Sequence, residues 1–221
     1  MTFFREAAAV AAKDLRLEAR TRVAFGQVAV LGVLIVVVLA MGLGPGSSSA
    51  DAPAILWVAY LFGGGLCFER TMAVERYDSA LSGLLLSPID RGAIFAGKLG
   101  ANLAVLLALA AVVTPVGVVL FHFDLSAAPL AFAGITALGL LGYAAIGTLF
   151  SALVSSVRQR GGLLALLVFP LSLPLVVVST QLSRRLLVAG DAPMTGLPIL
   201  VAFDVVFLVA GWLAFETALE P

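Results

Sequence analysis

Residues 67–98 read CFERTMAVERYDSALSGLLLSPIDRGAIFAGK, and this polar stretch decides how the flanking sequence folds. Long apolar segments precede and follow it, so its charges form an insert between them. Its eight charged residues are Glu69, Arg70, Glu75, Arg76, Asp78, Asp90, Arg91 and Lys98. Burying so many charges in an apolar interior is unfavourable, so we expect the insert to lie in water or against a soluble partner.

The composition of the whole chain indicates a membrane protein. Of its 221 residues, 62% are hydrophobic and 12% are charged, and its mean hydropathy is +1.13. A soluble domain of this length could not remove so much apolar surface from water, so we infer that the bilayer is its solvent. The formal net charge of zero disfavours a nucleic-acid partner, which requires a concentrated basic face. The single cysteine, Cys67, excludes an internal disulfide and a thiolate metal cluster.

The apolar segments predict an all-α integral membrane protein with six transmembrane helices in one domain, residues 1–221. The predicted spans are residues 23–43, 54–68, 93–120, 130–154, 163–178 and 197–215. Prolines predict a kink at Pro115 and an interruption of the fifth span at Pro170 and Pro174.

Residues 2–22 predict an N-terminal interfacial helix that lies on the membrane before the first span. At helical spacing, Phe3, Phe4, Ala7, Ala11 and Leu15 fall on one side, and Lys13, Arg16 and Arg20 share another. The basic side is expected to face anionic headgroups of the lipid bilayer. A cleaved signal peptide is the alternative, which the long polar lead and the length of the first span disfavour.

The distribution of basic residues predicts the orientation. Eleven of the 13 Lys and Arg residues fall in segments 1–22, 69–98 and 155–162, whereas Arg184 and Arg185 fall on the other side. By the positive-inside rule, the first group and both termini are expected in the cytoplasm.

Residues 69–87 predict a helix in the insert between the second and third spans. Val74, Tyr77, Leu81, Leu84 and Leu85 recur at three- and four-residue steps, and Ser87-Pro88 ends the pattern. One interpretation is a solvated loop resting on headgroups. The other is a cytoplasmic coupling helix that transmits the movement of a soluble partner, which the mixture of charge signs favours over a role in lipid binding. The expected contact residues are Glu69, Arg70, Glu75, Arg76, Asp78, Leu81 and Leu84, with Arg158 and Arg160 in the second cytoplasmic loop.

The segment Gly92–Lys98 matches the opening of a phosphate-binding loop, but nucleotide binding there is disfavoured. Leu99 stands where the Mg²⁺-binding hydroxyl is required, and no strand precedes the segment. Asp90 is instead the predicted N-cap of the third span. Lys98 and Asn102 are expected at the inner interface, with the Lys stem extended toward water. Any ATP must therefore be bound and hydrolysed by another polypeptide.

Two isolated polar residues are candidate functional groups. His122, the single histidine, is a candidate haem or metal contact or an interfacial loop residue. Asp204 lies inside the sixth span, where a carboxylate is costly and indicates function, a helix partner or a protonated, hydrogen-bonded group. Catalytic triads, paired catalytic carboxylates and HxxxH metal spacings are absent from the sequence, so no enzyme activity or metal site is expected.

Aromatic and small residues inside the spans have predicted packing roles. Trp57 and Tyr60 are expected in an interfacial aromatic belt. Gly139, Tyr143 and Gly147 align on the fourth span, where small residues permit close helix packing.

Several stretches together resemble a known family. They are KDLRLEAR at 13–20, AILW at 54–57, ALSGLLLSP at 80–88 with Asp90, Arg91, Gly97 and Lys98, and RGGLLALLVFP at 160–170 with Pro174. Nearly end to end, the chain resembles the CcmB-type permeases, the haem exporter protein B family of the cytochrome c maturation system. The C-terminal segment 214–221 and Asp204 depart from the family pattern.

The resemblance implies a multi-pass permease subunit of an ABC transporter in the bacterial inner membrane. It implies four partners: an ATPase subunit (A) that binds ATP, a haem-handling membrane subunit (C), a small membrane subunit (D) and a periplasmic haem chaperone. A second copy of the chain is a further possible partner. ATP hydrolysis would drive haem export or the release of haem-loaded chaperone, so haem is expected as a substrate of the complex and no cofactor is expected on this chain. The alternatives are an ABC permease for a lipid or drug and, from a different class, a secondary carrier powered by an ion gradient.

Overall fold

The structure is a computed structural model that describes residues 2–21, 23–44, 49–77, 90–126, 128–155, 162–189 and 196–218. It consists of helices α1 (Thr2–Thr21), α2 (Val23–Leu43), α3 (Ala52–Tyr77), α5 (Arg91–Phe121), α6 (Pro129–Ser155), α7 (Leu163–Arg184), the short π-helix η2 (Arg185–Ala189) and α8 (Leu197–Ala218). Among the described residues, six helices are long and apolar enough to cross a membrane. This confirms the predicted all-α fold with six spans.

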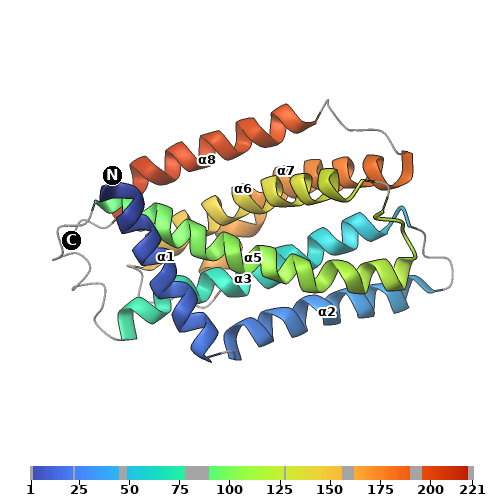
Figure 1. Cartoon of the computed structure of the whole chain (residues 1–221), viewed down its shortest axis with the longest axis horizontal. Helices are drawn as coiled ribbons and strands as arrows, with labels where there is room; N and C mark the ends of the chain where they lie inside the picture. Colours follow the sequence, from blue (N-terminus) through green and yellow to red (C-terminus); the bar gives the residue numbers. More distant parts are fainter. Residues whose placement is uncertain are drawn as a thin grey trace.

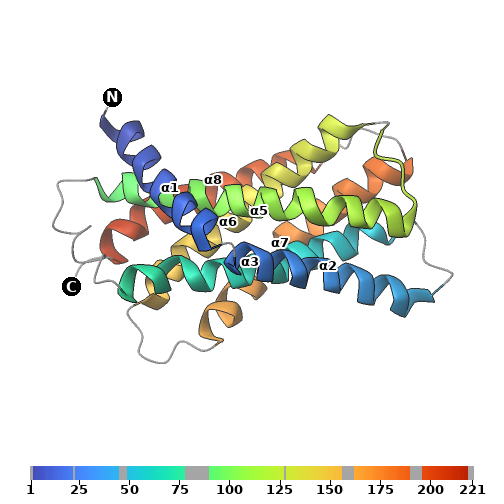
Figure 2. The ribbon, with the colours of Figure 1, turned by 60° about the horizontal axis from the view of Figure 1, so that its bottom comes forward.

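The six spans run alternately up and down the bundle, so the two termini lie at the same end (Figure 1). We call this the terminal end, and it contains the ends of α3 and α6 and the starts of α5 and α7. Arg184 and Arg185 lie at the opposite end. α2 and α8 form opposite edges of the bundle, and α1 crosses the bundle obliquely near the terminal end in both views (Figures 1 and 2).

Two spans, α3 and α7, extend more than one helical turn beyond their predicted ends. α3 continues without a break from Ala52 to Tyr77, so residues 69–77 of the predicted coupling helix extend the span itself. The remaining predicted coupling residues, 78–87, lie outside the described part of the chain.

α7 also departs from prediction, because its prolines do not interrupt it. The helix continues through Pro170 and Pro174 to Arg184, and residues 185–189 add a π-helical turn. Between the two prolines, the Ser172 hydroxyl donates a hydrogen bond to the Val168 carbonyl oxygen at 2.7 Å. Membrane helices tolerate proline when side chains and neighbouring helices stabilise the freed backbone groups. Pro115 likewise lies within a continuous α5.

α3 and α6 form the centre of the bundle through close packing at glycine. A Cβ atom at Gly147 of α6 would overlap the ring of Phe68 on α3, and one at Gly139 would overlap Trp57. Tyr143 is buried and its hydroxyl donates to the Leu61 carbonyl oxygen at 2.5 Å. The predicted packing role of Gly139, Tyr143 and Gly147 is confirmed.

Trp57 and Tyr60 do not face an interfacial aromatic belt, contrary to the prediction. Both are buried inside the bundle, with their rings 5.5 Å apart in an edge-on arrangement. The Trp57 indole donates to the Ser183 hydroxyl at 3.3 Å, and the Tyr60 and Thr114 hydroxyl oxygens are 2.7 Å apart. Aromatic rings with one polar atom can enter an apolar interior when that atom finds a partner, and here neighbouring helices supply it.

Candidate coupling interface

The terminal end gathers most of the charged groups that the sequence singled out. Glu69 is exposed on α3, one residue beyond the buried Phe68. The backbone of Arg70, Glu75 and Arg76 continues this helix away from the apolar core. Asp78, Leu81, Leu84, Arg158 and Arg160 lie outside the described residues, so their role as contact residues stays a prediction.

α1 packs closely against the first turns of α5. Gly97 makes this approach possible, because a Cβ atom there would lie 2.6 Å from both the Ala7 carbonyl oxygen and the Val10 Cβ atom. Val10 is 4% exposed, so α1 buries a side chain in the bundle. α1 covers residues 2–21 of the predicted segment 2–22, and its place on a membrane surface stays a prediction.

A buried ion pair joins the same two helices. Lys98 on α5 is 1% exposed, and its Nζ atom lies 3.3 Å from Asp14 Oδ2 on α1. Lys13 Nζ lies 3.2 Å from the other oxygen of the same carboxylate. The prediction that the Lys98 side chain extends to water is therefore wrong, because α1 covers this side chain and supplies a negative charge. Removing one partner of a buried pair is destabilising, so the pair holds α1 in one position on α5.

The start of α5 is tied to both α1 and α8. Asp90 is the N-cap, as predicted: its side chain accepts from the Gly92 amide at 2.7 Å. The Asp90 amide in turn donates to Glu6 Oε2 of α1 at 3.4 Å. Phe3 of α1 stacks on Trp212 of α8 with ring centroids 5.1 Å apart. Asp90, the first described residue after residues 78–89, is thus hydrogen-bonded to α1, and Trp212 of α8 lies against Gly92. α5 begins as a helix where a phosphate-binding loop would have been required.

Below this layer, polar groups from three spans meet inside the bundle. The Asn102 amide of α5 donates to the Thr148 hydroxyl of α6 at 2.8 Å, and Cys67 of α3 lies 3.7 Å from Asn102 Oδ1. Side-chain hydrogen bonds between membrane helices contribute ~0.6 kcal/mol on average. These contacts connect α3, α5 and α6 directly beneath the terminal end.

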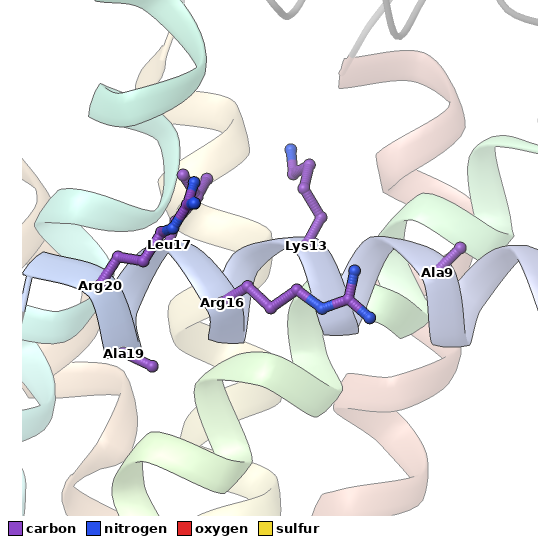
Figure 3. Close-up of a pocket in the computed structure, with 6 residues that line it drawn as sticks. All are labelled: Ala9, Lys13, Arg16, Leu17, Ala19 and Arg20. Carbon is purple, nitrogen blue, oxygen red and sulfur yellow. The ribbon is translucent and has the colours of Figure 1, made fainter.

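The outward side of α1 carries a basic groove of about 620 Å³. Its lining residues are Ala9, Lys13, Arg16, Leu17, Ala19 and Arg20 (Figure 3). Arg16 and Arg20 are exposed. Three basic side chains beside small apolar groups suit an anionic surface, either lipid headgroups or an acidic face of a protein.

The two isolated candidates from the sequence lie elsewhere. His122 is the C-cap of α5, with a φ of 52° in the left-handed region, and its amide donates to the Val118 carbonyl oxygen. It is exposed, and the described residues contain no group of three potential metal ligands. The C-cap role gives His122 a structural function that requires no ligand, and haem contact by His122 stays a prediction. Asp204 is buried in α8, where it packs against Gly142, the middle residue of α6.

Sequence reasoning missed the partners that assemble this interface. Asp14 and Lys98, and likewise Glu6 and Asp90, are 84 positions apart. Each residue is ordinary for its own helix, so no local signal identifies the pairs. The basic side of α1, formed by Lys13, Arg16 and Arg20, was in contrast predicted from helical spacing alone.

The six alternating spans and the charged terminal end define a multi-pass α-helical membrane protein. The CcmB protein family matches residues 5–221. Over 210 residues the chain is 32% identical to the heme exporter protein B of Paracoccus denitrificans (strain Pd 1222), covering 94% of this chain and 95% of that relative. It is also 32% identical over 177 residues to the heme exporter protein B of Bradyrhizobium diazoefficiens (strain USDA 110), covering 76% and 75% of the two chains. The chain belongs to the CcmB protein family.

Proposed function

We propose that this chain is the permease subunit of an ABC transporter for cytochrome c maturation. In this proposal, a separate ATPase subunit binds and hydrolyses ATP, and the spans use that energy to export haem or to release haem-loaded chaperone. The observation that carries the proposal is the family match over residues 5–221, together with relatives named heme exporter protein B.

The ATPase is proposed to dock at the terminal end. α3 ends there at Tyr77 and α5 begins there after Asp90, and the start of α1 and the end of α8 lie at the same end. The excess of Lys and Arg in these segments supports a cytoplasmic position by the positive-inside rule. The location that follows is the bacterial inner membrane, with both termini in the cytoplasm.

The proposed coupling is mechanical. Force applied to residues 69–87 would pass directly into α3, because the helix is continuous from Tyr77 back to Phe68 and the centre of the bundle. At the start of α5, the N-cap residue Asp90 is hydrogen-bonded through its amide to Glu6 of α1. The ion pair between Asp14 and Lys98 would make α1 and α5 move as one unit.

The remaining partners follow from the family. A haem-handling membrane subunit, a small membrane subunit, a periplasmic chaperone and a second copy of this chain are proposed to complete the assembly. Exposed apolar side chains on α2 and α8 leave both edges of the bundle available to lipid or to these subunits.

Charge reversal in the insert tests the proposal. Glu75→Lys and Asp78→Lys should reduce maturation of c-type cytochromes at least tenfold and weaken co-purification of the ATPase subunit. Asp124→Lys, in an exposed loop at the opposite end, is the matched control and should preserve both. Full ATPase binding together with full maturation in both insert variants would disprove the coupling role. Haem retained by the complex purified in mild detergent would favour haem as the transported substrate.

The rival is a carrier driven by an ion gradient, and the observation that favours it is the buried carboxylate of Asp204. The two functions differ in their energy source. Inactivating the nucleotide site of the ATPase subunit should abolish maturation if the proposal is correct. Activity that survives this change and disappears when the membrane is made permeable to protons would support the carrier.

A further inference from the structure

Asp204 of α8 points into the interface between α6, α7 and α8. It is 3% exposed. A Cβ atom at Gly142 of α6 would overlap both Asp204 Oδ1 and a methyl group of Leu175 on α7. The carboxyl group therefore lies directly against the glycine of one neighbouring helix and close to a leucine of another.

Among the described residues, four buried side-chain atoms lack a hydrogen-bond partner, and those of Asp204 and Ser179 lie at this interface. The atoms are both carboxylate oxygens of Asp204, Ser179 Oγ of α7 and Thr136 Oγ1 of α6. Ser179 Oγ lies 2.6 Å from the Cβ position of Gly139, which is three residues from Gly142 and therefore on the adjoining part of the same helix face. Unpaired buried polar atoms are rare, so a carboxyl group with both oxygens unpaired calls for a specific explanation.

The three groups lie at successive levels along α6 rather than at one depth. Thr136 and Asp204 are each seven residues from the start of their helix, which corresponds to about 10 Å of helix rise. Ser179 is five residues before the last residue of α7. Ser179 nevertheless packs against Gly139 and Asp204 against Gly142, the middle residue of α6, so Asp204 lies near the middle of the bundle and closer to the start of α8 than to its end.

No described positive charge lies close to Asp204 on the helices packed against it. α6 contains no charged residue, and its titratable group is Tyr143. α7 contributes Arg184, which is exposed at its end, and α5 contributes Arg91 and Lys98 at the terminal end. An ionised carboxylate in this setting would be strongly unfavourable, whereas a protonated one is neutral and can donate a hydrogen bond.

We propose that Asp204 is a proton-binding site, occupied while α6, α7 and α8 are packed together and emptied toward the opposite end when α8 separates from α6. Release is a simple acid dissociation. The O–H bond of the carboxylic acid breaks, its electron pair stays on the carboxylate oxygen, and water at the opposite end takes the proton. Any movement of α8 away from α6 would then be linked to proton release, in addition to the proposed use of ATP.

Infrared spectroscopy of the purified full chain in lipid nanodiscs tests the occupancy of the site. At neutral pH the protein should show a carboxylic-acid carbonyl band that shifts in D₂O and with isotope-labelled aspartate. The near-isosteric Asp204→Asn should remove this band, and the exposed control Asp124→Asn should leave it unchanged. The labelling needs no substitution, so the result holds even if Asp204→Asn does not fold.

Two outcomes would overturn the proposal. Absence of the band in the unmodified protein would show that Asp204 is ionised, and a band that appears only after sodium and potassium are removed would show a metal-cation site instead.

Hydrogen–deuterium exchange tests the link to movement of α8. On raising the pH from mildly acidic to mildly alkaline, exchange in α8 relative to α2 should increase several-fold in the unmodified chain and stay constant in Asp204→Asn. Equal behaviour of the two proteins would separate proton binding from helix movement and reject the linkage.

Discussion

The central helices α3 and α6 differ from the edge helices α2 and α8 in an instructive way. The central pair has the lowest mean hydropathy of the six spans, yet 61% and 72% of its span residues are buried. The edge pair is more hydrophobic, and 17% of the span residues are buried in each helix. A soluble protein would show the reverse trend. In a bilayer the lipid accepts apolar side chains, so the interior is free to use glycine, hydroxyl and aromatic groups that bring helices together.

The comparison predicts that a charge on an edge helix has the largest effect. Leu34 lies near the middle of α2 and is 54% exposed. Leu34→Lys should reduce insertion of α2 by about 2.5 to 3.5 kcal/mol if this side chain faces lipid, whereas Leu34→Phe should be neutral. A glycosylation-mapping assay of membrane insertion measures both. Normal insertion and folding of the Lys variant would mean that this edge faces water or a polar partner.

Added volume on a central helix should have the next largest effect. Gly147→Ala places a Cβ atom where the ring of Phe68 lies, and that ring is fully buried and cannot move outward. We expect a loss of about 1 to 3 kcal/mol of stability from overpacking.

Gly134 on the same helix provides the matched control. It has no atom within 4 Å of its Cβ position. Gly134→Ala should be neutral or stabilising by up to about 1 kcal/mol, since alanine favours helix over glycine. Thermal unfolding in detergent compares the two variants, and equal effects would contradict the tight packing of α3 against α6.

Removal of a central hydrogen bond should have an intermediate effect. Thr148→Val removes the hydrogen bond that the Asn102 amide donates to the Thr148 hydroxyl, at an expected cost of about 0.6 to 1.7 kcal/mol. Thr136→Val on the same helix is the control, because its hydroxyl has no partner among the described residues. If both substitutions lower the unfolding temperature equally, the bond between α5 and α6 is not a net stabiliser.

The smallest effect is expected in the loop that leads from α5 to the central helix α6. Hydrogen bonds from the Ser126 side chain and backbone amide hold the pKa of the Asp124 carboxyl below its usual value. The Ser126 amide donates to Asp124 Oδ1 at 2.8 Å. A lowered folded-state pKa stabilises the protein above the ordinary aspartate pKa of about 3.9, and this contribution is lost as the pH falls through the folded-state value.

Ser126→Ala should raise the pKa of Asp124 measured by NMR and weaken this shallow acid dependence of stability, because the hydroxyl is lost and the backbone amide remains. Because the loop is exposed, the change in unfolding temperature at neutral pH should be close to zero. An unchanged pKa in the variant would show that the Ser126 hydroxyl does not contribute.

Local chemistry predicted most of the architecture. Apolar length located six spans, Asp90 was recognised as an N-cap from its position before a helical pattern, and the spacing of Gly139, Tyr143 and Gly147 indicated a packing face. These features depend on neighbours within a few residues along the chain, which is why sequence patterns reveal them.

Predictions that required knowledge of neighbouring helices were wrong. Proline was expected to interrupt α7, and Trp57 and Tyr60 were expected at the lipid interface. In each case a group on the same or another helix stabilises what the isolated segment would not tolerate. Lys98 was expected to reach water for the same reason, because the position of α1 over α5 was unknown.

The sequence by itself determined the membrane setting, the six helices and the polar insert, because hydropathy and helical periodicity are properties of continuous segments. Only the tertiary structure decided which polar groups meet. It joined Asp14 to Lys98 across 84 positions, and it placed Asp204 against Gly142 in an interface without a nearby positive charge. Such contacts arise from helices far apart in the chain, and their electrostatic consequences depend on burial that exists only after the helices pack.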